Sequence, residues 1–151
     1  MRIKTTPHLN FRGQARAALE FYGSVFGGEV TLTTYGDVGM PKDLPDADKV
    51  VFGQVESAAG FRVMAYDVPG HTEPAADVGS TRRENGTTLT TQPFFVSVRA
   101  ESFEEVEAYW KRLSEGSSVV APLAATPWSA GFGMLTDRYQ VTWSLDVAPA
   151  A

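Results

Sequence analysis

Few side chains in this 151-residue chain are suited to acid–base or metal chemistry. It has two histidines, His8 and His71, and no cysteine. The lack of cysteine excludes disulfides, zinc–thiolate sites and thiol nucleophiles. His8 falls in a segment that alternates like a strand, whereas His71 falls in a polar, turn-rich segment. We therefore take His8, together with Glu56, as the candidates for a general acid and base, although no spacing requires a nucleophile–base pair.

Strand periodicity places a larger set of side chains on one common face of the predicted sheets. This set is aromatic with a few polar points, which suits a small organic ligand held by apolar contact and oriented by two or three hydrogen bonds. The alternative is that the same side chains pack together as a second core. We expect Trp128 in the loop before a strand, in the position of a lid. The predicted ligand-binding residues are His8, Asn10, Phe52, Gln54, Glu56, Met64, Tyr66, Phe95, Trp128, Phe132, Met134 and Ser144.

The elements that must position these residues begin with a first module of strand, helix, strand and hairpin. We predict these elements over residues 3–11, 14–26, 29–35, 49–56 and 61–67. The hairpin turn is predicted to be Ala58-Ala59-Gly60, with Gly60 in the left-handed conformation that glycine tolerates. This turn pairs three sets of residues across the hairpin, namely Phe52 with Tyr66, Gln54 with Met64, and Glu56 with Arg62.

A second module repeats the pattern after a polar stretch, residues 69–92, which we predict to be a linker. Its helix begins after Ser102, whose capping box is completed by Glu105. The predicted elements are a strand over 94–99, this helix, a strand over 117–121, a loop over 122–130 and a hairpin over 131–136 and 141–147. Matching residues recur 88 positions apart, from Phe21 to Tyr109 and from Gly28 to Gly116. Such a repeat predicts two modules that stack on each other, with function where they meet.

Composition limits the classes of partner. The chain carries 18 acidic and 13 basic residues, a net charge of -5, which argues against nucleic acid, because phosphate binding needs clustered Lys and Arg. The basic cluster Arg82-Arg83 is expected in a solvated loop, with an anion site as the alternative. No apolar run is long enough to cross a membrane or to form a signal peptide, so we expect a cytoplasmic protein with no membrane partner.

Two long segments, PHLNFRGQARAALEFYGSVFGGEV and PWSAGFGMLTDRYQVTW, resemble the PhnB-like branch of the vicinal oxygen chelate superfamily. That superfamily includes glyoxalase I, bleomycin-resistance proteins and extradiol dioxygenases. The resemblance implies an α+β fold in which two tandem βαβββ modules form a curved mixed sheet around a cavity, with helices on the outer face, usually in a homodimer. It gives a single domain over 1–151, with module one at 1–68, a linker at 69–92 and module two at 93–147.

Glyoxalase-type members hold a divalent metal through four side chains, and the resemblance locates these positions here. They fall on His8, on Met64, at or beside Phe94 and Phe95, and on Ser144. A thioether, a phenyl ring and a hydroxyl cannot replace imidazole and carboxylate ligands, so we expect neither a metal nor another cofactor. An all-oxygen site using Glu56 or Asp146 stays open, since Mg²⁺ and Ca²⁺ need no histidine.

The same resemblance also locates one departure in the last hairpin turn, where Gln140 replaces the usual glycine. A left-handed backbone at Gln140 would cost ~1 kcal/mol.

These observations favour a metal-independent protein that binds or sequesters a small organic molecule, as bleomycin-resistance proteins do. The alternative is a lyase or isomerase, metal-free or weakly metal-dependent, that uses His8 and Glu56 as acid and base.

Overall fold

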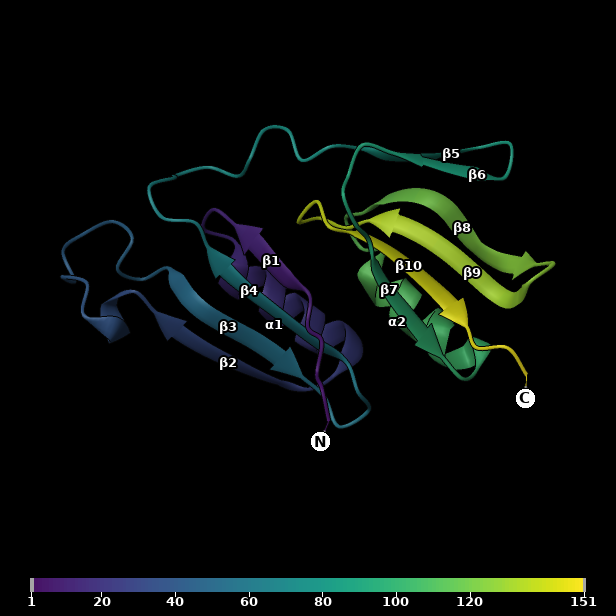
Figure 1. The fold of residues 1–151 in the computed structure, drawn as a ribbon, viewed down its shortest axis with the longest axis horizontal. Coiled ribbons are helices and arrows are strands. Elements are labelled where there is room, and N and C mark those ends of the chain that lie inside the picture. Colours follow the sequence, from purple (N-terminus) through teal and green to yellow (C-terminus); the bar gives the residue numbers. More distant parts are fainter. Residues whose placement is uncertain (1, 151) are drawn as a thin grey trace. The chain divides into compact units, whose positions relative to one another are not determined.

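The computed structural model describes residues 2–150. Contacts between residues divide the chain into two compact units, one ending at Ala76 and the other starting at Asp77 (Figure 1). Each unit contains one helix and a four-stranded sheet of mixed direction. This is the predicted α+β fold with two βαβββ modules. No helix in residues 2–150 is long and apolar enough to cross a membrane.

The first unit has the sheet order β1-β4-β3-β2, in which β1 runs parallel to β4 and the other pairs are antiparallel. Its helix packs against β2, β3 and β4. A short 3-10 turn, η1, follows β2 at Gly36–Val38. The remaining elements are β1 (His8–Phe11), α1 (Ala15–Phe26), β2 (Glu29–Thr34), β3 (Val50–Glu56) and β4 (Arg62–Asp67).

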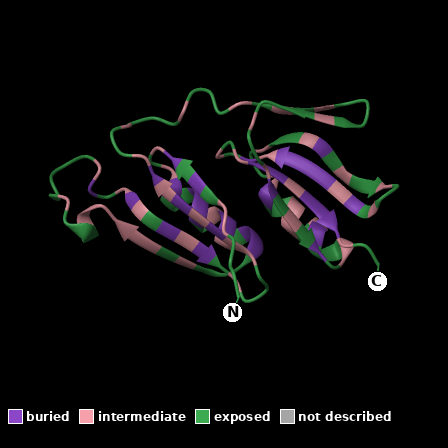
Figure 2. Cartoon of the chain, in the orientation of Figure 1, coloured by how far each residue is buried: buried purple, intermediate pink, exposed green. Residues whose placement is uncertain are grey.

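The core of this unit lies between α1 and one face of its sheet. Leu19 and Tyr22 of α1 are fully buried, as the helical spacing predicted. Gly53 on β3 allows this close packing, because a Cβ there would collide with Cδ1 of Leu19 and come within 2.9 Å of the carbonyl oxygen of Ala65. The strands β3 and β4 alternate between buried and less buried residues (Figure 2). One sheet face therefore belongs to the core and the other is left without a helix.

The β3–β4 hairpin has the predicted turn, and two of the three predicted residue pairs are found across it. Gln54 pairs with Met64 and Glu56 with Arg62. Gly60 has φ +108°, and its N–H donates to the carbonyl of Ser57. The turn prediction is confirmed, because Gly60 has the positive φ that glycine adopts without backbone strain.

The second unit has the sheet order β7-β10-β9-β8, with β7 parallel to β10. The hydroxyl of Ser102 accepts a hydrogen bond from the N–H of Glu105 at 3.2 Å, which confirms the predicted cap of α2. Trp143 is fully buried, and Trp110 of α2 packs where a Cβ on Gly133 would stand, 2.7 Å from its ring. The elements are β7 (Val96–Ala100), α2 (Phe103–Leu113), β8 (Ser118–Thr126), β9 (Ser129–Thr136) and β10 (Thr142–Val147).

The prediction of a loop over residues 122–130 is wrong. Strand β8 continues through Pro122 to Thr126, and only Pro127 and Trp128 separate it from β9. Pro122 is tolerated because β8 is an edge strand, so its missing N–H need not remove a hydrogen bond between strands. The pairing of β8 with β9 also shifts register around Ala121, as at a β-bulge. Trp128 therefore lies in a tight turn rather than in a mobile lid.

The stretch predicted as a linker contains an additional hairpin, β5 (Thr81–Glu84) and β6 (Thr87–Thr90). Its turn is Asn85-Gly86, and both residues have positive φ, 52° and 75°. These values suit a two-residue turn whose twist matches that of the strands. The hairpin belongs to the second unit.

The β9–β10 turn is organised by a buried carboxylate. Oδ1 of Asp137 accepts hydrogen bonds from the N–H groups of Tyr139 and Val141, and Oδ2 accepts one of 2.8 Å from the indole of Trp143. Gln140 has φ +70°, so the backbone at this non-glycine residue is left-handed and the cost considered from the sequence applies.

Candidate functional site

The face of the first sheet opposite α1 brings together eight predicted side chains, and we call it the first open face. The register places His8 beside Met64, Met64 beside Gln54, and Gln54 beside Thr31. Strand β2 thus adds Thr31 and Thr33, which the sequence analysis did not include although strand periodicity places them there. The predicted members of the face are His8, Asn10, Phe52, Gln54, Glu56, Arg62, Met64 and Tyr66.

His8 is held at one side of this face by two neighbours. Its Nδ1 lies 3.0 Å from Oδ1 of Asn10, so Nδ1 carries the proton in this pair and donates it. Its ring meets the ring of Tyr66 edge-on, with centroids 5.4 Å apart. Within residues 2–150 no hydrogen bond uses Nε2 of His8, so this nitrogen can accept a hydrogen bond from a ligand.

The centre of the first open face is apolar and partly accessible. Phe52 is 40% exposed, and Met64 and Tyr66 are half-buried. No hydrogen bond in the described part of the chain involves the Gln54 amide or the Tyr66 hydroxyl. The arrangement therefore offers apolar surface beside polar groups that a ligand can bind.

Glu56 lies in a different environment from His8. Its Oε2 is 3.4 Å from Nη1 of Arg62 and 3.9 Å from Nζ of Lys4. Two strand spacings and two residues along the strand separate Glu56 from His8, about 12 Å between Cα atoms. The structure brings His8 together with Asn10 and Tyr66, and Glu56 together with Arg62, but not the two candidates with each other.

One hydroxyl near this face is electrostatically perturbed. The Tyr35 hydroxyl donates a 2.7 Å hydrogen bond to the carbonyl of Asp67. Burial raises the pKa of Tyr35 above its usual value, and the neighbouring Tyr66, Asp67 and Asp46 raise it further. Tyr35 therefore stays protonated near neutral pH and acts as a donor.

The corresponding face of the second sheet, opposite α2, is the second open face. The Ser97 and Ser144 hydroxyls lie 3.3 Å apart on it, and the half-buried Phe95 immediately precedes β7. Asp146 is held by Arg99 through two nitrogens, with a shortest distance of 2.8 Å. Hydrogen bonding to this carboxylate raises the pKa of Arg99, so the guanidinium stays protonated at neutral pH.

The β5–β6 hairpin covers part of the second open face. Met134 is 2% exposed and Thr142 is 3% exposed, although neither faces α2. The Thr88 hydroxyl donates to Sδ of Met134 at 3.6 Å, and the Thr142 hydroxyl donates to Oε1 of Gln92 at 2.6 Å. Met134 was predicted to contact a ligand, but the chain itself occupies that contact here. Of the other predicted residues at this end, Phe132 is half-buried and Trp128 is 57% exposed.

Comparison with known proteins identifies the family. Residues 7–145 match the family described as Glyoxalase/Bleomycin resistance protein/Dioxygenase superfamily. The chain belongs to this superfamily. The match extends over both units, from before β1 to within β10, so the predicted family resemblance is confirmed.

Several individual proteins resemble the chain over nearly its whole length. Protein PA1353 from Pseudomonas aeruginosa superposes with a TM-score of 0.74 at 29% identity, covering 97% of this chain and 98% of that one. A Bacillus cereus PhnB protein, described as a putative 3-demethylubiquinone-9 3-methyltransferase, gives 0.71 at 23% identity, with 97% and 100% covered. Protein YjdN of Escherichia coli is 22% identical over 143 residues, which are 94% of this chain and 93% of that protein. The PhnB-like fold is shared with these proteins.

The donors at the superfamily's metal positions do not fit a divalent ion. In the first sheet His8 is paired with Met64, so these positions offer one imidazole. In the second sheet Ser144 is paired with Ser97, so they offer two hydroxyls. The side chains described in residues 2–150 include no group of three or more His, Cys, Asp or Glu placed to hold a metal ion. The carboxylates left open for an oxygen site, Glu56 and Asp146, are both engaged by arginines. We therefore derive no step through a metal.

Proposed function

We propose that this superfamily member binds a small planar organic molecule on its first open face without a metal ion. The observation that carries this proposal is the combination of a partly exposed Phe52, Met64 and Tyr66 with polar groups that lack protein hydrogen bonds in the described residues. Aromatic and thioether side chains favour flat, apolar ligands. A protein that only captures such a molecule needs no reacting group.

The polar groups on this face define what such a ligand should carry. Nε2 of His8 accepts a hydrogen bond, whereas the Gln54 amide can both donate and accept. The row from His8 through Met64 to Gln54 spans two strand spacings, about 10 Å, which is the length of a two- or three-ring molecule. We therefore expect a heteroaromatic ligand with a donor at one end and an amide-like group at the other.

Acid–base catalysis by His8 and Glu56 receives no support from this geometry. The Cα atoms of the two residues are about 12 Å apart, and the carboxylate of Glu56 is already paired with Arg62 instead of lying beside His8. Binding is thus the function that the first open face supports best.

The proposal is tested by NMR titration with 1H-indole-5-carboxamide, a two-ring molecule with an N–H donor at one end and an amide at the other. We expect shifts of the Tyr66 and Gln54 signals, with Phe52→Ala weakening binding about tenfold through loss of ring contact worth ~1–2 kcal/mol. The control is Leu44→Ala, because Leu44 is also exposed in this unit but lies outside the first open face. Equal affinities in the two variants, or no shift on this face, would contradict the proposal.

We also infer a homodimer in the cytoplasm, on the basis of the family resemblance and of exposed sheet edges. The edge strand β8 carries Val119, which is half-exposed, and an unpaired edge favours association with another chain. Light scattering tests the dimer, and a species of 16.3 kDa at micromolar concentration would contradict it.

A further inference from the structure

The β5–β6 hairpin brings one arginine over two aromatic rings of the second unit. Cζ of Arg83 lies 5.1 Å from the ring centroid of Phe132 and 6.0 Å from that of Trp128. The two rings meet edge-on, with centroids 5.5 Å apart. A guanidinium at these distances is attracted by the negative faces of the rings, so Arg83 is held in place by its neighbours.

Arg83 has no carboxylate partner among the described residues. The adjacent Glu84 is 2.8 Å from Arg82 instead, and Asp146, which pairs with Phe132 across the sheet, is bound to Arg99. The hydrogen bond that Arg83 makes, 2.6 Å from Nη1 to the Thr88 hydroxyl, uses one of five N–H donors. A positive charge with free donors thus lies beside the rings.

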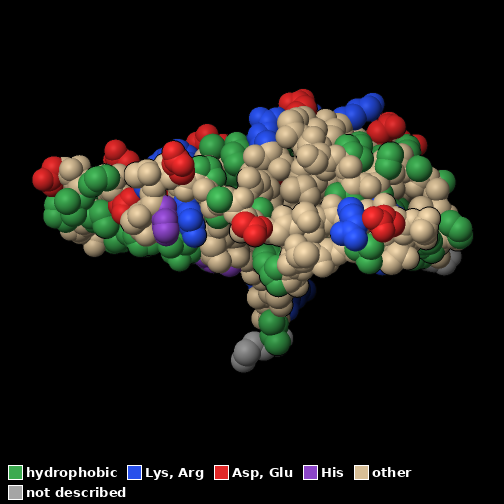
Figure 3. Space-filling model, turned by 90° about the horizontal axis from the view of Figure 1, so that it is seen from above, with side chains coloured by type: hydrophobic (Ala, Val, Ile, Leu, Met, Phe, Trp, Pro, Cys, Tyr) green, Lys and Arg blue, Asp and Glu red, His purple; other side chains and the backbone are tan. Residues whose placement is uncertain are grey.

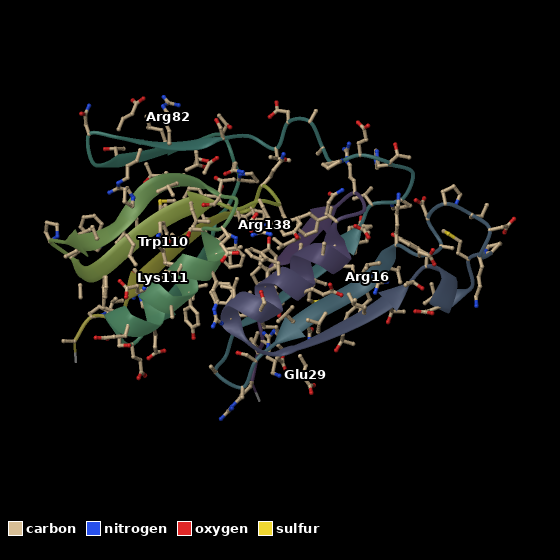
Figure 4. All side chains as sticks on the ribbon, turned by 180° about the vertical axis from the view of Figure 1, so that it is seen from behind. Arg16, Glu29, Arg82, Trp110, Lys111 and Arg138 are labelled. Atoms are coloured by element: carbon tan, nitrogen blue, oxygen red, sulfur yellow. The ribbon has the colours of Figure 1, made fainter. Side chains whose placement is uncertain are left out.

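The two neighbouring arginines point to opposite sides of the hairpin. Arg83 pairs with Thr88, which contacts Met134, so this side faces the sheet. Arg82 is exposed, and its side chain is directed away from β8 and β9 (Figure 4). On the surface seen in Figure 3, basic and acidic side chains alternate rather than gathering in one basic patch. Arg83 therefore differs from Arg82 in the side of the hairpin on which it lies, and not in the charge of the surrounding surface.

Trp128 supplies the apolar part of this cluster. It is 57% exposed at the two-residue turn between β8 and β9. The exposed face of this indole, next to a guanidinium without a carboxylate partner, is suited to stacking with the ring of a flat aromatic ligand.

We propose that Arg83, Trp128 and Phe132 form a binding site for an aromatic carboxylate. The carboxylate accepts two parallel hydrogen bonds from the Arg83 guanidinium, and the ring of the ligand stacks on Trp128. This site lies entirely in the second unit and is independent of the ligand proposed for the first open face. It assigns a function to the hairpin, which places the arginine.

The test compares 2-naphthoate with the neutral, isosteric 2-naphthamide, using the indole N–H signal of Trp128 in the full-length chain. We expect naphthoate to bind at least tenfold more tightly, because a hydrogen bond to a charged group adds ~1.5–3 kcal/mol. Arg83→Gln should remove this preference, whereas Arg82→Gln, which changes the charge equally, should retain it. Arg83→Lys keeps the charge but loses the paired donors, and should bind naphthoate with intermediate affinity.

Three results would overturn the proposal. The first is that naphthamide binds as tightly as naphthoate, and the second is that Arg82→Gln weakens binding as much as Arg83→Gln. The third is an unchanged Trp128 signal at about 10 mM naphthoate, tenfold above a weak Kd of ~1 mM. Amide spectra of each variant show whether the hairpin is still folded, and signals of the first unit serve as an internal reference.

Discussion

Replacement of Asp67 by asparagine should strongly destabilise the first unit. Asp67 ends β4, is 1% exposed, and joins three segments through its carboxylate. Oδ1 accepts hydrogen bonds from the N–H groups of Gly13 at 2.7 Å and Ala15 at 3.0 Å, and Oδ2 accepts one from Val50 at 2.9 Å. The side chain therefore fixes the start of α1 against the start of β3.

The size of the effect follows from these three bonds. Asparagine retains one acceptor oxygen, so its amide nitrogen would face the buried N–H of Val50, and a buried unsatisfied donor costs ~1–3 kcal/mol. The two remaining bonds change from charged to neutral, a loss of ~1 kcal/mol each. The sum is about 4 kcal/mol, which for a chain of this size lowers Tm by roughly 10 °C.

Thermal unfolding followed by circular dichroism measures this change. The control is Asp37→Asn, because Asp37 also accepts a backbone hydrogen bond, from Thr34 at 2.9 Å, but in an exposed position. We expect a much smaller shift for the control, since water replaces the lost bond. A Tm for Asp67→Asn within about 2 °C of the wild type, under 1 kcal/mol, would refute the reasoning.

Three further substitutions test other features of the first and second units. Gly28→Ala should destabilise by ~2 kcal/mol or more in urea unfolding, because Gly28 has φ +113° and a Cβ would stand 2.6 Å from the carbonyl oxygen of Glu56. Gln140→Gly should stabilise by up to ~1 kcal/mol in the same assay, because it relieves a left-handed non-glycine residue at φ +70°. The pKa of Asp46 is lowered, chiefly by its hydrogen bond from Lys49. Its contribution to the free energy of unfolding is therefore complete above the unfolded carboxyl pKa of about 3.9, and is lost as the pH falls through the pKa of the folded state. Asp46→Asn should therefore lower Tm at pH 7, and the difference from wild type should vanish under strongly acidic conditions.

Much of the fold was predictable because it depends on local rules. Periodicity identified both helices, and the need for a left-handed residue at Gly60 fixed the register of the β3–β4 hairpin. The hairpin at 81–90 was missed because its strands are rich in threonine and lack an apolar alternation. The Asn85-Gly86 pair was the signal that could have identified it, since this dipeptide favours a two-residue turn.

The candidate site was likewise predictable in part, where it depends on strand periodicity, and not where it depends on contacts distant in sequence. Strand parity placed His8, Met64 and Gln54 in one row, and the register confirms that they are neighbours. The burial of Met134 was not predictable, because it depends on a hairpin that is distant in sequence. The extension of β8 was missed because Pro122 usually marks a loop, and its tolerance depends on the strand being at a sheet edge.

The most direct test of the account is a titration of the wild-type protein with 1H-indole-5-carboxamide, followed by NMR, with and without EDTA. The account predicts shifts on the first open face, the same affinity in both conditions, and about tenfold weaker binding in Phe52→Ala. Binding that EDTA abolishes and that divalent ions restore, with loss of the effect in His8→Ala, would contradict the central claim of metal-independent capture.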